Sequence, residues 1–420
     1  MARETRVQEY AQASSNGADP LLEQLVRFNR CWEIIQHSVP YYAVLVDKGQ
    51  IPSRFDNWEQ FLQTMPVADR AFVYEHLPEL SDRTRPPEDL RTTGGSTAQP
   101  ISLPAWRSET GETERNEWLG RSWYDIDPEE PSFRLWGHSH LLGKGWRGWI
   151  NGRKRILKDA LLGIERISAY DLSDEALLRA YQILQVSDAA YMVGYSAALD
   201  RFARVIRQAK KMNRTPLKAV VATSESFPLA DSREIISEAF DAPVALEYGS
   251  VETGVMAHTR PNDGYHVFWL SYFIEAVEPA PQGGYKVRVT SLYPRAFPLL
   301  RYDLGDAIML DAPCLGVRYF PEVLGRANLF LELETGERIH SEALSHAVKG
   351  IRAVSGYQMI QENGTFTLFL TALSAITPEE ICEIRARLGK INPRLSKTPI
   401  RVVARLEQTR AGKTPMIIRR

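Results

Sequence analysis

Residues 92–100 read Thr-Thr-Gly-Gly-Ser-Thr-Ala-Gln-Pro, a composition that suits the binding of a polyphosphate. Glycine lets backbone N–H groups turn toward an anion without a Cβ in the way, and the Ser and Thr hydroxyls add further donors. The stretch is not a nucleotide-binding loop of the kind in which Lys follows the glycines, because that Lys is missing. An ordinary Gly/Ser/Thr surface turn is the alternative. Its function therefore depends on what else the chain contains.

Composition narrows the class of protein. A chain of 420 residues is too long for one compact core and predicts two domains. A net charge of −1 argues against nucleic acid or an anionic membrane as a partner of the whole chain. No apolar run approaches ~18 residues, which predicts no membrane span, and residues 1–20 lack the apolar segment of a secretory signal. Three widely spaced cysteines favour a reducing cytoplasm and offer no zinc spacing.

The order of the predicted elements indicates an α/β fold. Apolar residues at helical spacing predict helices within residues 21–77, and one long helical stretch over 172–212. A short apolar strand over 217–223, a helix over 231–240 and a strand from 244 follow in turn, which favours parallel pairing. Residues 265–310 contain three strand-like runs and predict a β-rich section. We therefore expect a large, multi-layer N-terminal α/β domain.

A domain boundary is expected near Arg326. The roughly 90 residues after it alternate strand-like and helical runs, enough for a small α+β domain. The prediction is a large domain over residues 1–326 and a small, mobile C-terminal domain over residues 327–420.

Four later stretches give the loop at 92–100 a sharper meaning. They are YGSVETG at 248–254, PLLRYDLGD at 298–306, VLGRANL at 323–329 and AGKTP at 411–415. Together, and in this order, the five motifs resemble those of the adenylate-forming superfamily, the acyl-CoA synthetases and their relatives. The short N-terminal region and the TTGGST loop are most similar to the phenylacetate–CoA ligase branch and its capsular-polysaccharide-type relatives.

The resemblance implies a nucleotide site whose cofactors are ATP and Mg²⁺. Glu252 matches the glutamate that meets Mg²⁺, and Asp306 the aspartate that accepts the ribose hydroxyls. Tyr248 would lie against adenine, with a core tyrosine as the alternative, and Arg326, at the domain hinge, would contact ribose or phosphate. The ATP β- and γ-phosphates would be held by Thr92, Thr93, Gly94, Gly95, Ser96 and Thr97. The remaining nucleotide-site candidates are Ser224, Glu225 and Ser226, at a strand end beside adenine, and Gly249 and Ser250 of the YGSVETG motif.

Lys413 is the residue that the resemblance assigns to the chemistry. A lysine in a Gly-Lys pair near the C-terminus enters the site when the small domain closes and bridges the carboxylate and the α-phosphate. A preorganised cation at this point is worth on the order of 3–4 kcal/mol. A solvated lysine in a basic tail is the alternative. The implied reaction forms an acyl-adenylate with release of pyrophosphate, after which the small domain rotates and admits the acceptor.

The carboxylic acid is the less determined substrate. Six of the nine tryptophans lie between residues 106 and 149, so an aryl or other small acid that stacks on Trp136 near His138 is the working hypothesis, with core tryptophans as the alternative. The basic run over 147–158 suits the phosphates of coenzyme A or an acidic carrier protein, or it is a solvated face.

Two positions depart from the resemblance, and the acceptor stays open. Ala98 and Gln99 stand where the family loop usually has Gly and then Lys or Glu, which is expected to weaken nucleotide affinity. The acceptor is the thiol of coenzyme A or of a carrier-protein phosphopantetheine, or else a nitrogen nucleophile in a secondary-metabolite or polysaccharide pathway. A nucleotide-binding relative without catalysis is the third interpretation. A homodimer is expected from the resemblance, and no nucleic acid or membrane partner.

Overall fold

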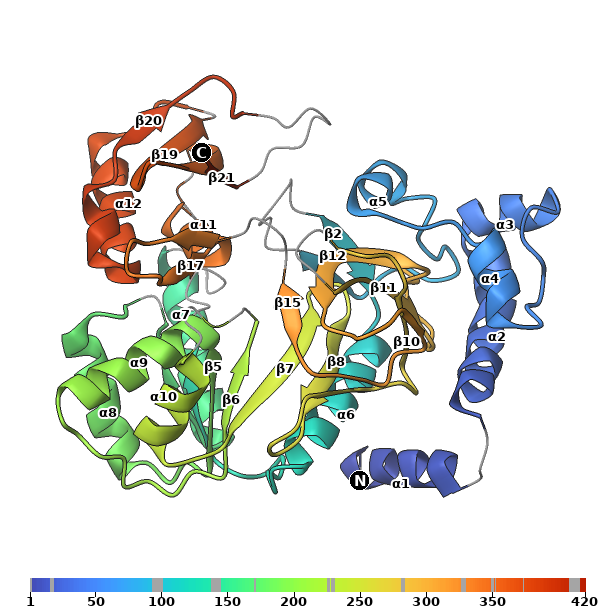
Figure 1. The fold of residues 1–420 in the computed structure, drawn as a ribbon, viewed down its shortest axis with the longest axis horizontal. Coiled ribbons are helices and arrows are strands. Elements are labelled where there is room, and N and C mark those ends of the chain that lie inside the picture. Colours follow the sequence, from blue (N-terminus) through green and yellow to red (C-terminus); the bar gives the residue numbers. More distant parts are fainter. Residues whose placement is uncertain are drawn as a thin grey trace. The chain divides into compact units, whose positions relative to one another are not determined.

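The computed structural model describes residues 2–15, 19–92, 101–136, 145–169, 171–224, 227, 231–280, 284–325, 330–348, 351, 353–372, 374–407 and 416–420. They belong to two compact units that alternate along the chain (Figure 1). Unit 1 consists of Met1–Thr93, Pro100–Tyr124 and Leu246–Ala327, and unit 2 of Gly94–Gln99, Asp125–Ala245 and Asn328–Arg420. The division into domains 1–326 and 327–420 stays a prediction.

The N-terminal part of unit 1 is helical because its apolar residues recur on one side of each helix. Asp19 caps the second helix by accepting from Leu21 N at 3.0 Å, and the same helix buries Phe28 and Trp32 completely. Trp58 stacks flat on Phe273 with ring centroids 3.6 Å apart, which ties this helical part to the sheet of the unit. The helices of unit 1 are α1 (Ala2–Ser15), α2 (Pro20–Ser38), α3 (Pro40–Asp47), α4 (Trp58–Thr64), α5 (Arg70–His76) and α6 (Arg107–Ser122).

The strands of unit 1 pair antiparallel. The hairpin β1–β2 flanks residues 93–100, one sheet has the order β13-β10-β11-β12-β15, and four further strands follow the order β14-β9-β8-β7. The strand bounds are β1 (Asp89–Thr92), β2 (Ser102–Ala105), β7 (Val244–Ser250), β8 (Gly254–Thr259), β9 (Tyr265–Val267), β10 (Tyr272–Ala276), β11 (Tyr285–Ser291), β12 (Tyr302–Ile308), β13 (Cys314–Leu315), β14 (Tyr319–Phe320) and β15 (Val323–Gly325). The boundary between the units falls inside β7, after Ala245. The predicted β-rich section is confirmed.

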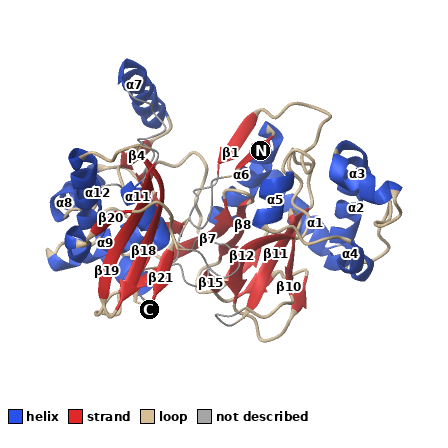
Figure 2. Ribbon diagram, turned by 90° about the horizontal axis from the view of Figure 1, so that it is seen from above, coloured by secondary structure: helices blue, strands red, loops and turns tan. Residues whose placement is uncertain are grey.

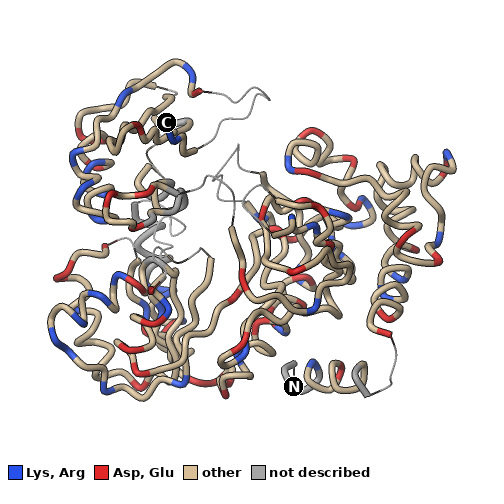
Figure 3. The backbone as a smooth tube through the Cα atoms, viewed as in Figure 1, with Lys and Arg blue, Asp and Glu red and all other residues tan. Residues whose placement is uncertain are grey.

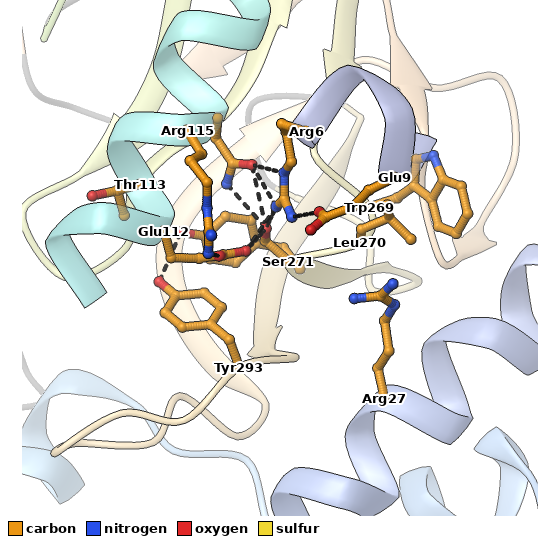
Figure 4. A network of polar contacts seen from close by, with 12 residues as sticks. Arg6, Glu9, Arg27, Glu112, Thr113, Arg115, Trp269, Leu270, Ser271 and Tyr293 are labelled. Carbon is orange, nitrogen blue, oxygen red and sulfur yellow. Dashed lines mark hydrogen bonds and ion pairs between the residues drawn. The ribbon is translucent and has the colours of Figure 1, made fainter. Parts of the chain in front are cut away.

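A buried polar network joins α1 to α6 in unit 1 (Figure 4). The Arg6 guanidinium, 2% exposed, donates at 2.7 Å to both Glu112 and Asn116, and it also contacts Ser271. Burial alone raises the pKa of the Glu112 carboxyl, but the charges of Arg6 and Arg115 and the Ser271 hydrogen bond outweigh it, so this pKa lies below its ordinary value. The network fixes α6, which also carries a carboxylate of the candidate site.

Unit 2 contains the parallel strands that the sequence predicts. Their order is β6-β5-β3-β4, and β3–β4, β3–β5 and β5–β6 all pair parallel. The elements of this part are β3 (Ser132–Leu135), α7 (Gly145–Leu161), β4 (Ile164–Ile167), α8 (Asp174–Val186), β5 (Tyr191–Tyr195), α9 (Ser196–Gln208), β6 (Val220–Thr223) and α10 (Ser232–Phe240). The carboxyl ends of β3, β5 and β6 therefore lie at one edge.

The C-terminal part of unit 2 has an apolar core of its own. Leu331, Met359, Leu370 and Ile384 belong to this core, and none of them is measurably exposed. The strand order is β20-β19-β18-β21, and a capping box of Thr377 and Glu380 starts α12. The elements are β16 (Phe330–Glu332), β17 (Arg338–His340), α11 (Ser341–Val348), β18 (Val354–Glu362), β19 (Thr365–Ala372), α12 (Pro378–Ile391), η2 (Pro393–Lys397), β20 (Ile400–Val402) and β21 (Ile417–Arg419).

The single helical stretch predicted over 172–212 is wrong. Ser173 caps α8, but the helix ends at Val186, and β5 intervenes before α9 begins at Ser196. Residues 191–194 are buried between β3 and β6, so burial on both faces of a sheet outweighs their helical spacing. The α/β fold class is confirmed.

Charge and apolar length add two observations. Acidic and basic residues are both spread over the described chain, in keeping with a net charge near zero (Figure 3). Among the residues that the structure describes, no helix has the length and hydropathy needed to cross a membrane.

Candidate functional site

The turn between β7 and β8 is held by hydrogen bonds between its own residues. Ser250 N donates to Thr253 Oγ1 at 3.0 Å, and Thr253 N donates to Ser250 Oγ at 3.2 Å. Thr253 Oγ1 donates onward to the carbonyl of Gly254 at 2.7 Å, and the Tyr272 hydroxyl donates to the carbonyl of Thr253. The short polar residues of the YGSVETG motif therefore build a rigid turn around Glu252.

Two glycines of this turn lie where a side chain has no room. A Cβ on Gly249 would lie 2.0 Å from the carbonyl oxygen of Gly254, and a Cβ on Gly254 would lie 2.4 Å from Cγ2 of Thr113. Gly254 also has φ +72°, a conformation that favours glycine. A bulge between Tyr248 and Gly249 shifts the pairing with β8. The close approach of the two strands thus depends on Gly249.

Glu252 is a buried carboxylate, only 5% exposed, at the tip of this turn. Its Oε1 accepts from the Tyr302 hydroxyl at 3.4 Å and lies 3.5 Å from Nη1 of Arg70. Arg295 donates to its backbone carbonyl. The side chain is held from β12 and α5, while its backbone is held from the loop that follows β11.

The Arg295 side chain that bonds to the backbone of Glu252 also forms a buried ion pair. The Arg295 guanidinium, 3% exposed, approaches Glu109 Oε2 at 3.4 Å and donates to the Tyr293 hydroxyl at 2.9 Å. Glu109 is fully buried, and Arg91 of β1 lies 3.6 Å from the same oxygen. The β1–β2 hairpin and the β7–β8 turn therefore contact one charged cluster, made of Arg91, Glu109 and Arg295.

Asp306 and Tyr248 come from different strands and meet through a hydrogen bond. The Tyr248 hydroxyl donates to Asp306 Oδ2 at 3.2 Å. The Tyr248 ring is 7% exposed and contacts Tyr265 and Phe320 edge-on, with centroids 6.3 and 5.8 Å away. Tyr248 is thus part of the core of unit 1, and its hydroxyl is directed at the carboxylate of Asp306.

Arg301 fixes the strand that carries Asp306. This residue has φ +47°, strained for a side chain of its size. Its guanidinium binds Glu275 at 2.9 to 3.1 Å and donates to the carbonyls of Leu62 and Met65 at 2.7 and 2.9 Å. These buried, charge-assisted bonds offset the strain and set the start of β12.

Thr92 ends β1 beside the predicted phosphate loop. It pairs with Ser102 of β2, and the two hydroxyls are 2.9 Å apart. The predictions for Thr93, Gly94, Gly95, Ser96 and Thr97 lie outside the described residues, as do those for Glu225, Ser226, Arg326, Lys413 and His138. The structure therefore describes the hairpin that presents the loop, and not the loop.

In unit 2, three residues lie at the carboxyl ends of neighbouring parallel strands. Trp136 directly follows β3 and stacks on Tyr195 at the end of β5, with centroids 4.5 Å apart and planes 28° apart. Ser224 directly follows β6 with φ +74°. Ligands of open α/β sheets bind at this end of the strands, and a strained residue there is typical of a site.

Three contributors were not predicted from the sequence. Arg295 and Glu109 lie in none of the five motifs, and their pairing joins residues 186 positions apart in the chain, which no local pattern signals. Tyr195 was not recognised as the end of a strand, because its segment has helical spacing. Its place after four buried residues and before a helix is the signal that identifies a strand end.

The fold has known relatives. No family model matches the chain. It is similar to 2-hydroxyisobutyryl-CoA ligase in complex with 2-HIB-AMP and CoA, with a TM-score of 0.59 and 17% identity over 94% of this chain and 89% of that one. The same ligase in its postadenylation state with R3-HIB-AMP gives a TM-score of 0.57, again with 17% identity and the same coverage. The chain therefore shares its fold with this acyl-CoA ligase.

One curated protein matches part of the chain. The chain is 28% identical over 191 residues to Protein CapK of Staphylococcus aureus. The match spans 44% of this chain and only 41% of the length of CapK.

Proposed function

We propose that this protein activates a carboxylic acid with ATP, forming an acyl-adenylate and pyrophosphate, and then transfers the acyl group to a thiol. The observation that carries the proposal is the contact between Tyr248 and Asp306, 58 residues apart in the chain, in a fold whose solved relative binds an acyl-AMP and CoA. Both residues were selected from sequence motifs for the same nucleotide.

The nucleotide would lie between the two motif strands and the β1–β2 hairpin. Asp306 would accept the ribose hydroxyls, because an ionised carboxylate accepts two O–H donors, and Tyr248 would orient that carboxylate and flank adenine. Thr92 and the loop to Thr97 would donate to the phosphates. Ser224 to Ser226, Gly249, Ser250 and Arg326 complete the proposed nucleotide site.

Glu252 is the proposed ligand for Mg²⁺. Among the described residues no group of three or more His, Cys, Asp or Glu side chains is arranged to hold a metal. Mg²⁺ bound with nucleotides does not need such a cage, because it keeps waters and uses one or two carboxylates together with phosphates. A single buried carboxylate on a rigid turn fits that requirement. The metal would neutralise phosphate charge.

The adenylation step needs positioning and charge neutralisation. A carboxylate oxygen of the acid forms a bond to the α-phosphorus of ATP, the bond from that phosphorus to the bridging oxygen breaks, and pyrophosphate leaves with the electron pair. Lys413 would donate to the acid carboxylate and the α-phosphate while negative charge is shared between them. Holding both reactants in line removes much of the entropic cost.

The acid would bind where Trp136 stacks on Tyr195. A flat pair of aromatic rings offers an apolar face to an aryl or other small acid, and His138 is proposed beside it. In the second half-reaction the thiol sulfur of coenzyme A or of carrier-protein phosphopantetheine attacks the acyl carbonyl, and AMP leaves. Transfer to a nitrogen nucleophile is the alternative outcome. A cytoplasmic location and a homodimer stay predictions.

The test is ATP–pyrophosphate exchange over a panel of carboxylic acids, aryl acids included. Exchange that depends on one acid is expected, together with at least a hundredfold loss in Lys413→Ala. Lys397→Ala is the matched control, since Lys397 is an exposed lysine of the same C-terminal part. ATP binding without exchange for any acid would contradict the proposal. Adding coenzyme A, a carrier protein or an amine to the preformed adenylate then identifies the acceptor from the product.

A further inference from the structure

Helix α7 has the reverse of the usual amphipathic arrangement. Ile156, Leu157 and Leu161 are 70%, 64% and 79% exposed, and Leu162, directly after the helix, is 55% exposed. A helix of a globular protein normally turns its apolar side to the core and its polar side to solvent. Figure 2 shows α7 projecting from β4 and standing apart from α8 and α9 of the same unit. These four aliphatic residues are thus exposed.

Where the side chains of α7 are described, the side that faces β4 is polar. Asp159 accepts from Nε of Arg166 in β4 at 2.7 Å and from a second Arg166 nitrogen at 3.0 Å. Arg155, one turn earlier, lies 4.0 Å from the same carboxylate. At 100° per residue, Arg155 and Asp159 each lie about 160° around the helix from Leu157. Ion pairs therefore hold the helix to β4.

Basic residues lie on the same side of the helix as the exposed apolar residues and are interleaved with them. Arg153 and Lys154 lie within about 60° of Leu157 around the helix, and Lys158 about 100° away on the same half. All three side chains are exposed. Long basic side chains keep their charge in water while their stems cover apolar surface, which suits a boundary between an apolar and an anionic layer.

We propose that α7 binds peripherally to an anionic lipid surface, with Leu157 and Leu161 in the acyl region and Arg153, Lys154 and Lys158 at the head groups. Helices that lie in a membrane interface combine exposed aliphatic residues with Lys and Arg. A second copy of this chain fits less well, because a symmetric contact would bring the three cations of each helix against those of its mate. The inference goes beyond the adenylation reaction and does not rest on it.

The basic residues of α7 bear on one expectation from the sequence, that an anionic membrane is not a partner of this chain. The net charge of −1 argued against an anionic membrane, but that number averages over 420 residues. The described part of α7 from Arg153 to Leu161 carries four basic residues and one acidic residue. Salt screens electrostatic attraction to a surface within about 10 Å. The local charge of α7 therefore determines its attraction to an anionic surface, and the net charge of the whole chain does not.

The experiment is co-sedimentation of the full chain with vesicles of phosphatidylcholine alone or with a third of phosphatidylglycerol. Binding is expected only with the anionic vesicles, falling as salt rises from 0.05 to 0.5 M, and at least tenfold weaker in Leu157→Glu/Leu161→Glu. Val186→Glu is the matched control, because Val186 is an 83% exposed aliphatic residue on α8 and its replacement is expected to leave binding unchanged.

Thermal midpoints and acid-dependent exchange of the variants separate a lost surface from a lost fold. A wild-type chain that stays in the supernatant with every vesicle overturns the proposal. So does a double variant that binds as the wild type does. If the double variant instead loses self-association or the capture of an acidic carrier protein while the wild type ignores vesicles, the face belongs to a protein partner and the lipid proposal fails.

Discussion

Replacing Gly249 by Ala tests whether the close approach of β7 and β8 holds the candidate site together. The added Cβ would lie 2.0 Å from the carbonyl oxygen of Gly254 and 2.9 Å from Cα of Val255. Ordinary contact begins near 3.4 Å, so the strands must separate by about 1.4 Å. Both clashing groups are backbone, and no side chain can rotate away.

Overpacking of this kind costs about 1–3 kcal/mol. The expected result is a lower urea midpoint for Gly249→Ala and a loss of acid-dependent exchange larger than the loss of stability explains, because the shifted turn carries Glu252. Exchange is measured well below the unfolding temperature of each variant, so that the protein is fully folded. Magnesium and ATP are titrated separately.

Gly111→Ala is the control for this substitution. Gly111 lies within α6, and a Cβ there meets no atom within 4 Å. Alanine is therefore expected to stabilise the helix by about 0.5–1 kcal/mol and to leave exchange unchanged. A Gly249→Ala protein with the midpoint and exchange rate of the wild type would refute the argument from close packing.

Three further outcomes follow from the buried groups. Arg295→Met is expected to destabilise the protein by about 3–5 kcal/mol, because Glu109 loses the nearer of its two cations. Adding Glu109→Gln to the same chain should restore part of the lost stability. A double-mutant cycle without coupling between the two positions would count against the ion pair. Asp306→Asn is expected to raise the Kd for ATP roughly ten- to a hundredfold, and Tyr248→Phe less, as measured by calorimetry. Burial lowers the pKa of His258 to about 4, so the unfolded chain binds a proton below about pH 6.5 while the folded chain does not until about pH 4. Stability should therefore be complete above pH 6.5 and fall by roughly 3 kcal/mol as the pH drops through this window, and an unchanged slope in His258→Gln would show that another group titrates.

Much of the fold followed from local patterns. The helix over 231–240 and the strand over 217–223 were expected near their observed bounds, because apolar spacing and small polar ends agree with the tertiary structure there. Residues 191–195 were misassigned, since a strand buried on both faces shows no alternation to distinguish it from a buried helix. Spacing alone does not decide such a segment.

Some residues of the candidate site were predicted from the sequence, and others were not. The resemblance of the motifs selected Tyr248, Glu252 and Asp306, and their roles stay predictions. The stack of Trp136 on Tyr195 was not predicted, because the sequence pointed to Trp136 only as a surface for the acid. Lys413 lies outside the described residues, so its role remains a prediction.

By itself the sequence supplied the chemistry that we propose, through the resemblance of its ordered motifs, because the order of glycine, hydroxyl and carboxylate residues is a property of the chain that does not depend on its fold. Only the tertiary structure decided how those residues are supported. The Glu109–Arg295 pair exists because α6 and the loop after β11 meet in a buried region where neither charge is stable without the other. The exposed apolar side of α7 likewise depends on which side its ion pairs with β4 occupy, a choice that the periodicity of the helix leaves open.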